Sequence, residues 1–329
     1  TTKDHTCYYA RGLDEHVGRA VDVVSDLIVS PQFPAAEIPK EQEVVIEEMR
    51  MYADQPEELV FDHAETVLYP NHSLGRPIIG SEESVKGLTR ESLQSYVDRQ
   101  YVASRVVLTV AGNVDPAKII KLAERELGGL RTGVDQPRTP PPEMTPGEHV
   151  IGKPIQQAHL VIARRAFGIK DPRRTTVSVL NTLLGGGMSS LLSQNIREKY
   201  GFCYSIYSYF NLFDDAGDFG VYMATEPHKV DRSRQLIMRE IRRLAETNVS
   251  PRALVQAKAQ VKGGMLLGME SLTSRMNRLG RQELTMGQLT SPDAFAAQVD
   301  AVTADQVREL AQWLAEPEQF STIVLSPQD

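Results

Sequence analysis

The sequence is poor in cysteine and has no long apolar run, and both shortages restrict what the protein can be. Cys7 and Cys203 are the only cysteines among 329 residues, which excludes a disulfide framework. The lack of a C-x-x-C motif leaves a reducing compartment as the default. No apolar stretch approaches the length of about 20 residues that a membrane-spanning helix needs. The net charge is −7, without a basic stripe or an arginine-rich arm, so nothing indicates a nucleic-acid partner.

Histidine pairs that could hold a metal on one helix are also missing. None of the seven histidines stands four residues from another. His63 and His72 are separated by Pro70 and cannot share a helix face. His159 lies in a strand-like run, which favours a structural histidine over a ligand. Any metal site would need ligands from elsewhere.

A proline-rich stretch divides the chain. The segment "GVDQPRTPPPEMTPGEH", residues 133–149, carries five prolines, which disfavour both helix and sheet ladder. We therefore predict an N-terminal domain at 1–132, a linker at 133–149 and a C-terminal domain at 150–329.

Similar elements are expected on both sides of this linker. Before it, periodicity and caps predict strands at 5–10 and 106–112, and helices at 13–29, around 41–48, at 57–68, from Thr89 and after Asp115-Pro116. After it, they predict strands within 154–167, 203–210, 220–225 and 321–326, and helices after Pro172, up to Lys199, and after Pro227, Pro251 and Thr303.

The two halves match in register, which indicates an internal duplication. Tyr8 and Tyr222 are 214 residues apart, as are Ala10 and Ala224, and Thr89 and Thr303, whereas Ser30-Pro31 and Ser250-Pro251 are 220 apart, so an insertion lies between. The shared order of strands and helices predicts an α+β protein of two duplicated α/β-sandwich domains.

The copies differ at their starts. The second copy has a strand, a helix and a further strand before "GVYMAT", and the first has nothing before the matching "HTCYYA". We therefore expect the first domain to be truncated at its N-terminus, by a segment about as long as Val150–Asp218, because repeat units keep their length.

Two acids are placed unusually in the helix that contains "EQEVVIEEM". Glu41, Val44, Val45 and Glu48 share one face by the i, i+3, i+4, i+7 rule, with the valines as the expected buried stripe. A buried carboxylate is costly unless it is paired. Either this face turns from core to solvent, or one glutamate binds a metal while the other orients a partner.

The glycine run in "LLGGGMSS" has a simpler interpretation. Gly185–Gly187 lack the Walker lysine and do not match G-x-G-x-x-G. A flexible or closely packed turn is therefore favoured over a phosphate loop.

Several of these segments together resemble one family. "TTKDHTCYYARGLDEHVGRAVDVVSDLI", "KEQEVVIEEMRMY", "HSLGRPIIGSEESV" and "LLGGGMSSLLSQNIREKYGFCYSIYS" are similar to the pitrilysin/insulinase zinc metallopeptidases, the inverzincins, and most of all to the mitochondrial processing peptidase branch with its bacterial relatives. The resemblance covers nearly the whole chain.

The resemblance implies a set of site residues. Glu48 matches a zinc ligand, and Glu41 matches an acid that orients a partner of that site. The family's H-x-x-E-H motif is absent from the chain and is expected upstream of Thr1. Arg197 and Tyr204 match a pair that donates to the oxyanion of the tetrahedral intermediate, although a helix-end arginine and a strand tyrosine are ordinary residues.

The resemblance also implies a function. It predicts a zinc-dependent endopeptidase that cleaves peptides or presequence-like unfolded segments and that is inactive as this chain alone. The expected assembly is a homodimer, or a heterodimer with a related subunit, in the bacterial cytoplasm or, alternatively, the mitochondrial matrix. The alternative function is a non-catalytic partner or scaffold subunit.

Overall fold

The computed structural model describes residues 1–134 and 138–328, so three residues of the predicted linker lie outside the described part. The contacts divide the chain into two compact units, each built from three stretches. Unit 1 comprises Thr1–Met51, Ile78–Thr139 and Leu267–Leu289. Unit 2 comprises Tyr52–Pro77, Pro140–Leu266 and Thr290–Asp329.

The two units have exchanged one helical segment of the repeat. The segment with α3 (Pro56–Leu68) comes from the first copy but belongs to unit 2, and the segment with α10 (Leu272–Met286) comes from the second copy but belongs to unit 1. These segments start 215 residues apart (52 and 267) and end 212 apart (77 and 289), close to the repeat spacing. Because the units do not follow chain order, the division at 133–149 remains a prediction about the copies.

Unit 2 is built on a five-stranded mixed sheet, which confirms the α+β class. The strands are ordered β1-β5-β2-β4-β3. Only β1 and β5 are parallel, and the other neighbours are antiparallel. The bounds are Glu148–Lys153 (β1), Ala158–Ala166 (β2), Ile206–Leu212 (β3), Gly217–Thr225 (β4) and Ser321–Pro327 (β5). The strands predicted for this half are confirmed, with ends shifted by a few residues.

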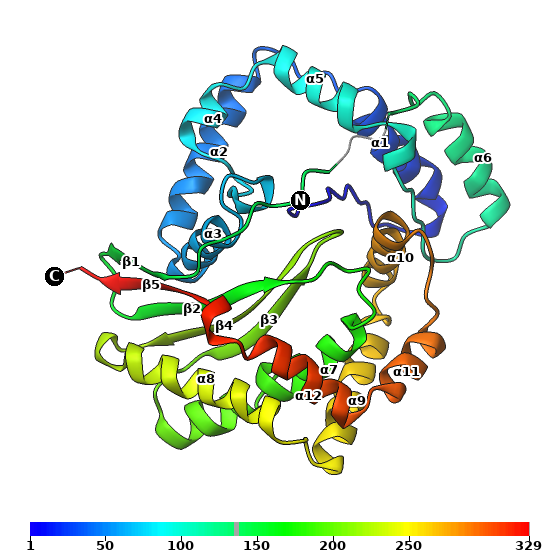
Figure 1. Ribbon diagram of the computed structural model, residues 1–329. Coiled ribbons are helices and arrows are strands. Elements are labelled where there is room, and N and C mark those ends of the chain that lie inside the picture. The colour runs from blue at the N-terminus through cyan, green and yellow to red at the C-terminus, as the bar shows by residue number, and fades with distance from the viewer. Residues whose placement is uncertain (135–137, 329) are drawn as a thin grey trace. The chain divides into compact units, whose positions relative to one another are not determined.

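Helices cover both faces of this sheet, because side chains alternate along each strand. Leu160 and Ile162 face a core with α7 (Arg174–Gly185), α8 (Val230–Glu246) and α12 (Ala304–Leu314). Val161 and Ala163 face a second core with α3. Figure 1 shows α3 on one side of the sheet and α8 and α12 on the other.

The remaining helices begin at capping residues. α9 spans Pro251–Gly268, and α11 spans Pro292–Ala301 after Ser291, whose hydroxyl accepts from the Ala294 amide. α12 follows Thr303, which forms a capping box with Gln306. Single turns lie at Asp14–His16, Ser73–Gly75, Ala103–Arg105, Pro227–Lys229 and Pro317–Gln319. No helix in the described ranges is long and apolar enough to cross a bilayer.

The regular elements in the described residues of unit 1 are all helices. Besides α10 it contains α1 (Val17–Val29), α2 (Ile38–Ala53), α4 (Glu82–Lys86), α5 (Arg90–Gln100) and α6 (Pro116–Leu127). The Thr89 and Asp115 caps are confirmed. α1 packs against α6, but few side chains are buried: Val21, Ser25, Ile46, Val85, Val97 and Val102.

Two strands predicted in this unit are wrong. Residues 5–10 and 106–112 form neither helix nor strand. Their counterparts in unit 2 are β4 and β5, which do not pair with each other: each pairs with β2.

Candidate functional site

The segment that leads to Arg197 begins with a closely packed glycine turn. A Cβ on Gly185 would clash with the Ser208 amide nitrogen and hydroxyl, so α7 approaches β3 only because this residue has no side chain. Gly187 has φ +150°, and Gln260 donates to the Gly186 carbonyl at 2.8 Å. The close packing at Gly185 agrees with the packed turn that was one of the two expected forms.

Arg197 lies on a helical segment, residues 191–200, whose middle (Ser193–Glu198) is a π-helix. Leu192 and Ile196 anchor this segment, with 0% exposure each. Asn195 donates to Glu240 at 2.8 Å, and Glu240 is itself buried. A π-helical turn is rare and frequently marks a functional site, because it re-aims the side chains that it carries.

The two predicted donors are both accessible. The Arg197 side chain is 34% exposed, and its guanidinium donates to Glu198 at 2.8 and 3.0 Å. Tyr204 is 92% exposed and lies in the loop between this helical segment and β3, two residues before the strand begins. Its phenol makes no hydrogen bond within residues 1–134 and 138–328.

The loop that presents Tyr204 is fixed on both sides. Gly201 turns the chain with φ +62°, which favours glycine. The buried Thr225 hydroxyl donates to the Phe202 carbonyl at 2.7 Å. Burial raises the pKa of the neighbouring Cys203 thiol to about 11, and the positive charge of Arg197 opposes that rise.

Chemically, this segment offers a cationic fork and a phenol on an exposed surface. Both groups donate hydrogen bonds, and a guanidinium suits an oxygen that gains negative charge. Its tie to Glu198 joins adjacent exposed side chains, a pairing worth little in water, so the guanidinium can turn toward a ligand.

The buried face predicted for α2 is wrong, because the helix is rotated by about one residue from the predicted orientation. Val44 is 60% exposed, and Glu41 and Glu48 are exposed as well. The buried residue is Ile46. Gln42, one turn before it, donates to the carbonyls of Val85 and Leu88 at 3.0 Å each. The helix therefore packs through the face of 42, 46 and 49, and the two glutamates point to solvent.

These acids do not form a zinc site with other described residues. No cluster of three or more His, Cys, Asp or Glu side chains suited to a metal occurs in residues 1–134 and 138–328. Zinc sites use at least about three protein ligands, and one exposed Glu48 does not meet that requirement.

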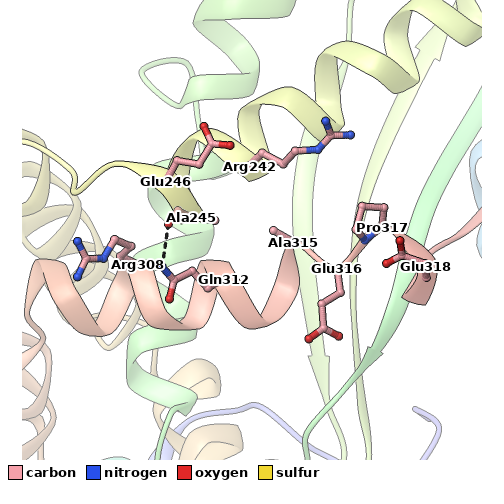
Figure 2. Close-up of a pocket in the computed structure, with 9 residues that line it drawn as sticks. All are labelled: Arg242, Ala245, Glu246, Arg308, Gln312, Ala315, Glu316, Pro317 and Glu318. Carbon is pink, nitrogen blue, oxygen red and sulfur yellow. Dashed lines mark hydrogen bonds between the residues drawn. The ribbon is translucent and has the colours of Figure 1, made fainter.

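Unit 2 has two surface hollows. The first is lined by ends of α8 and α12, with Gln312 donating to the Ala245 carbonyl at 3.2 Å (Figure 2). Its lining mixes Arg242 and Arg308 with Glu246, Glu316 and Glu318. The second is lined by Lys199, Arg239, Glu240 and their neighbours. Neither hollow is lined by Arg197 or Tyr204.

A polar network under α3 was not foreseen from the sequence. Tyr207 donates to Glu57 at 2.7 Å, and His159 shares a hydrogen bond of 2.9 Å with the Tyr222 hydroxyl. Burial lowers the pKa of His159. No local signal could find this network, because Glu57 and Tyr207 are 150 residues apart.

Comparison with known proteins gives consistent matches over the whole chain. The family model "Insulinase (Peptidase family M16)" matches residues 1–82, which include Glu41 and Glu48. The model "Peptidase M16 inactive domain" matches residues 87–261, which include Arg197 and Tyr204.

Individual relatives agree with these models. An uncharacterized zinc protease of Bacillus subtilis is 35% identical over 99% of this chain and 80% of its own length. One from Mycobacterium leprae is 36% identical over 99% of this chain and 74% of its own. The crystal structure of a peptidase M16 inactive domain from Pseudomonas fluorescens has the same fold, with TM-score 0.87, 20% identity, and coverage of 96% of this chain and 76% of that one.

Proposed function

Because the chain belongs to the insulinase (M16) peptidase family, we propose that it serves in a zinc-dependent endopeptidase that acts on unfolded, presequence-like peptide segments. The single observation that carries this proposal is the Arg197/Tyr204 segment. Two hydrogen-bond donors are accessible to solvent: Arg197 lies within a π-helical turn anchored in the core, and Tyr204 lies in the loop that leads to β3.

In this proposal Arg197 and Tyr204 bind the carbonyl oxygen of the scissile peptide bond. Both donate to the negative charge that this oxygen gains in the tetrahedral intermediate, and removing one such donor typically lowers kcat by about 10²–10³-fold. Since residues 1–329 do not form a metal site among their described side chains, no catalytic step is assigned to zinc. Glu48 as a ligand, with Glu41 orienting a partner, stays a prediction that needs imidazoles from outside these residues.

An extended substrate suits the sheet of unit 2. β3 is an outer strand, and it begins two residues after Tyr204. The free edge of such a strand can pair with an added peptide through backbone hydrogen bonds, which recognise any extended sequence. A peptide paired along β3 and continued past its start would run by Tyr204.

The test measures the preference for a tetrahedral anion over a planar amide. Calorimetry compares a peptide that carries a phosphinate at its central bond with the same peptide carrying an amide. We expect the unmodified chain to prefer the phosphinate, and Arg197→Ala and Tyr204→Phe each to reduce that preference by about tenfold or more, with amide binding unchanged. Arg252→Ala, at an exposed arginine of α9, is the matched control.

The alternative, a non-catalytic partner subunit, is favoured by the match to an M16 inactive domain. It predicts that the peptide binds equally well in both forms and that neither variant matters. That outcome would reject the oxyanion role.

The assembly and compartment remain proposals. We propose a homodimer, or a heterodimer with a related subunit, in the bacterial cytoplasm. Sedimentation equilibrium of the purified chain decides the first point, and a purely monomeric distribution would contradict it. The processing-peptidase branch likewise remains a prediction.

A further inference from the structure

Helix α8 gathers three arginines on one exposed face. Arg239, Arg242 and Arg243 stand at i, i+3 and i+4, so their side chains are neighbours. All three residues are exposed, on a chain whose net charge is −7. Like charges at this spacing repel one another. The cluster therefore costs stability unless negative charge lies close to it.

One buried carboxylate supplies part of that negative charge. Glu240 is 2% exposed and accepts hydrogen bonds from Asn195 at 2.8 Å and from Arg239 at 3.1 and 3.2 Å. The Arg243 guanidinium lies 3.5 Å from the same carboxylate. A single negative charge between two guanidinium groups holds both in place, but it neutralises only one of them.

These arginines line the second hollow of unit 2, whose volume is about 430 Å³. That volume falls within the range of small-molecule sites. Lys199, from the end of the helical segment 191–200, adds a fourth cation, and Glu246 adds a second carboxylate. Within residues 1–134 and 138–328, the side chains of Lys199 and Arg242 form no ion pair. The lining therefore has an excess of two positive charges.

The phenol of Tyr200, next in the chain to Lys199, responds to this charge. Its pKa is lowered, mainly because Arg239 donates a hydrogen bond to the phenol. Burial opposes this effect, and the positive charges of Lys199 and Arg232 lower the pKa further. Negative charge is therefore favoured beside the hollow.

We propose that this hollow binds a phosphate-class dianion, either inorganic phosphate or the phosphate monoester of a small soluble molecule. The planar guanidinium fork matches two phosphate oxygens at once. Two negative charges neutralise the excess of the lining, and the volume leaves room for the group that carries the phosphate. The site lies wholly within unit 2 and is independent of the proposed peptidase activity.

Calorimetry of the full chain at low ionic strength tests the proposal, with inorganic phosphate and glycerol phosphate as probes. We expect one saturable site, weakened about tenfold by Arg242→Ala and by Lys199→Ala, because each removes a charge-assisted contact. Both residues are exposed, so the fold should survive. Glu246→Gln should instead tighten binding, because it removes a like charge. Arg252→Ala in α9 removes an exposed arginine outside the hollow and should change nothing.

Two further measurements test the charge and the place of the ligand. Dimethyl phosphate has the tetrahedral shape of phosphate but a single charge, and it should bind about tenfold more weakly or worse. Nuclear magnetic resonance of isotope-labelled tyrosine should show the pKa of Tyr200 rising when phosphate is bound, because the ligand brings negative charge. Tyr200→Phe assigns the signal.

Three results would overturn the proposal. The first is no saturable binding of either soluble probe. The second is binding that Arg242→Ala and Lys199→Ala leave as strong as Arg252→Ala does, which would show only a diffuse attraction to the surface. The third is binding to vesicles that contain phosphatidic acid without binding of the soluble probes, which would identify a membrane contact in place of a small-molecule site.

Discussion

At the scale of single residues, the sequence pattern predicted a role for Arg197 and Tyr204, which stays a prediction, and it misplaced the buried face of α2. The pattern favoured Val44 as buried, whereas Ile46 is buried and Val44 is 60% exposed. A rotation by one residue, about 100°, separates these faces. The side chain of Gln42 donates to the carbonyls of Val85 and Leu88. A local sequence pattern cannot predict such contacts, because the partners are more than forty residues away.

A buried tyrosine gives a residue-scale prediction about stability. Tyr69 donates to Asp218 at 3.1 Å, and both residues are 1% exposed. Tyr69→Phe should destabilise unit 2 by about 1–3 kcal/mol, because it removes a donor from a buried carboxylate. Urea unfolding is followed by the fluorescence of Trp313, the single tryptophan, which lies in α12 of the same unit.

The control for that measurement loses the same hydroxyl at the surface. Tyr204 is 92% exposed, so Tyr204→Phe should change stability by less than about 0.5 kcal/mol. Equal losses for the two variants would show that the Asp218 contact contributes nothing.

At the scale of elements, the predicted helices are present, but among the predicted strands only those after residue 149 are. The capping residues Thr89, Asp115 and Thr303 each predict a helix, and each helix is present. Residues 106–112 have the composition of a strand, but a strand needs a neighbour, and the neighbour is set by distant sequence. The π-helical turn at Ser193–Glu198 also carries no sequence signal that we can identify.

The glycine turn before Arg197 gives an element-scale prediction. Gly185→Ala should destabilise unit 2 by about 1–3 kcal/mol, because the new methyl group collides with the β3 backbone at Ser208. Trp313 fluorescence in urea measures it.

Gly264→Ala in α9 is the opposite case. Nothing lies within 4 Å of its added Cβ, so it should stabilise the helix by about 0.5–1 kcal/mol. If the two substitutions behaved alike, close packing at Gly185 would not be the reason for its glycine.

At the scale of the whole molecule, the 214-residue spacing predicted the duplication but not the exchange of helices between units. Register alone cannot say which unit a helix joins, since both copies offer an equivalent face. The units also differ in how many apolar side chains they bury. Unit 2 has two apolar clusters on its sheet, whereas the buried residues of unit 1 are few and scattered.

Hydrogen exchange should reveal this division directly. Amides of α3 should exchange slowly with the sheet of unit 2, because Val60, Ala64 and Leu68 are buried there. Amides of α10 should exchange faster, since it buries no side chain. Mass spectrometry of peptic fragments resolves the two helices. Slower exchange in α10 than in α3 would contradict the unit assignment.

Metal content is a further property of the whole chain. After equilibration with zinc and dialysis, residues 1–329 should retain no stoichiometric zinc and show no zinc-dependent peptide turnover, because Glu48 has no co-ligands among the described side chains. Elemental analysis checks this. One retained zinc per chain that disappears in Glu48→Gln, but not in Glu47→Gln, would show that the site is complete after all.

The exchange of α3 and α10 has a consequence for ancestry and for cutting the chain. Cleavage between residues 133 and 149 would leave each piece without a helix that the other piece carries. A gene that encoded a single copy would have met the same shortage. Two such chains could each gain the missing helix by exchanging it with the other, as domain-swapped dimers do. The present polypeptide corresponds to such a dimer with its two copies covalently linked in one chain.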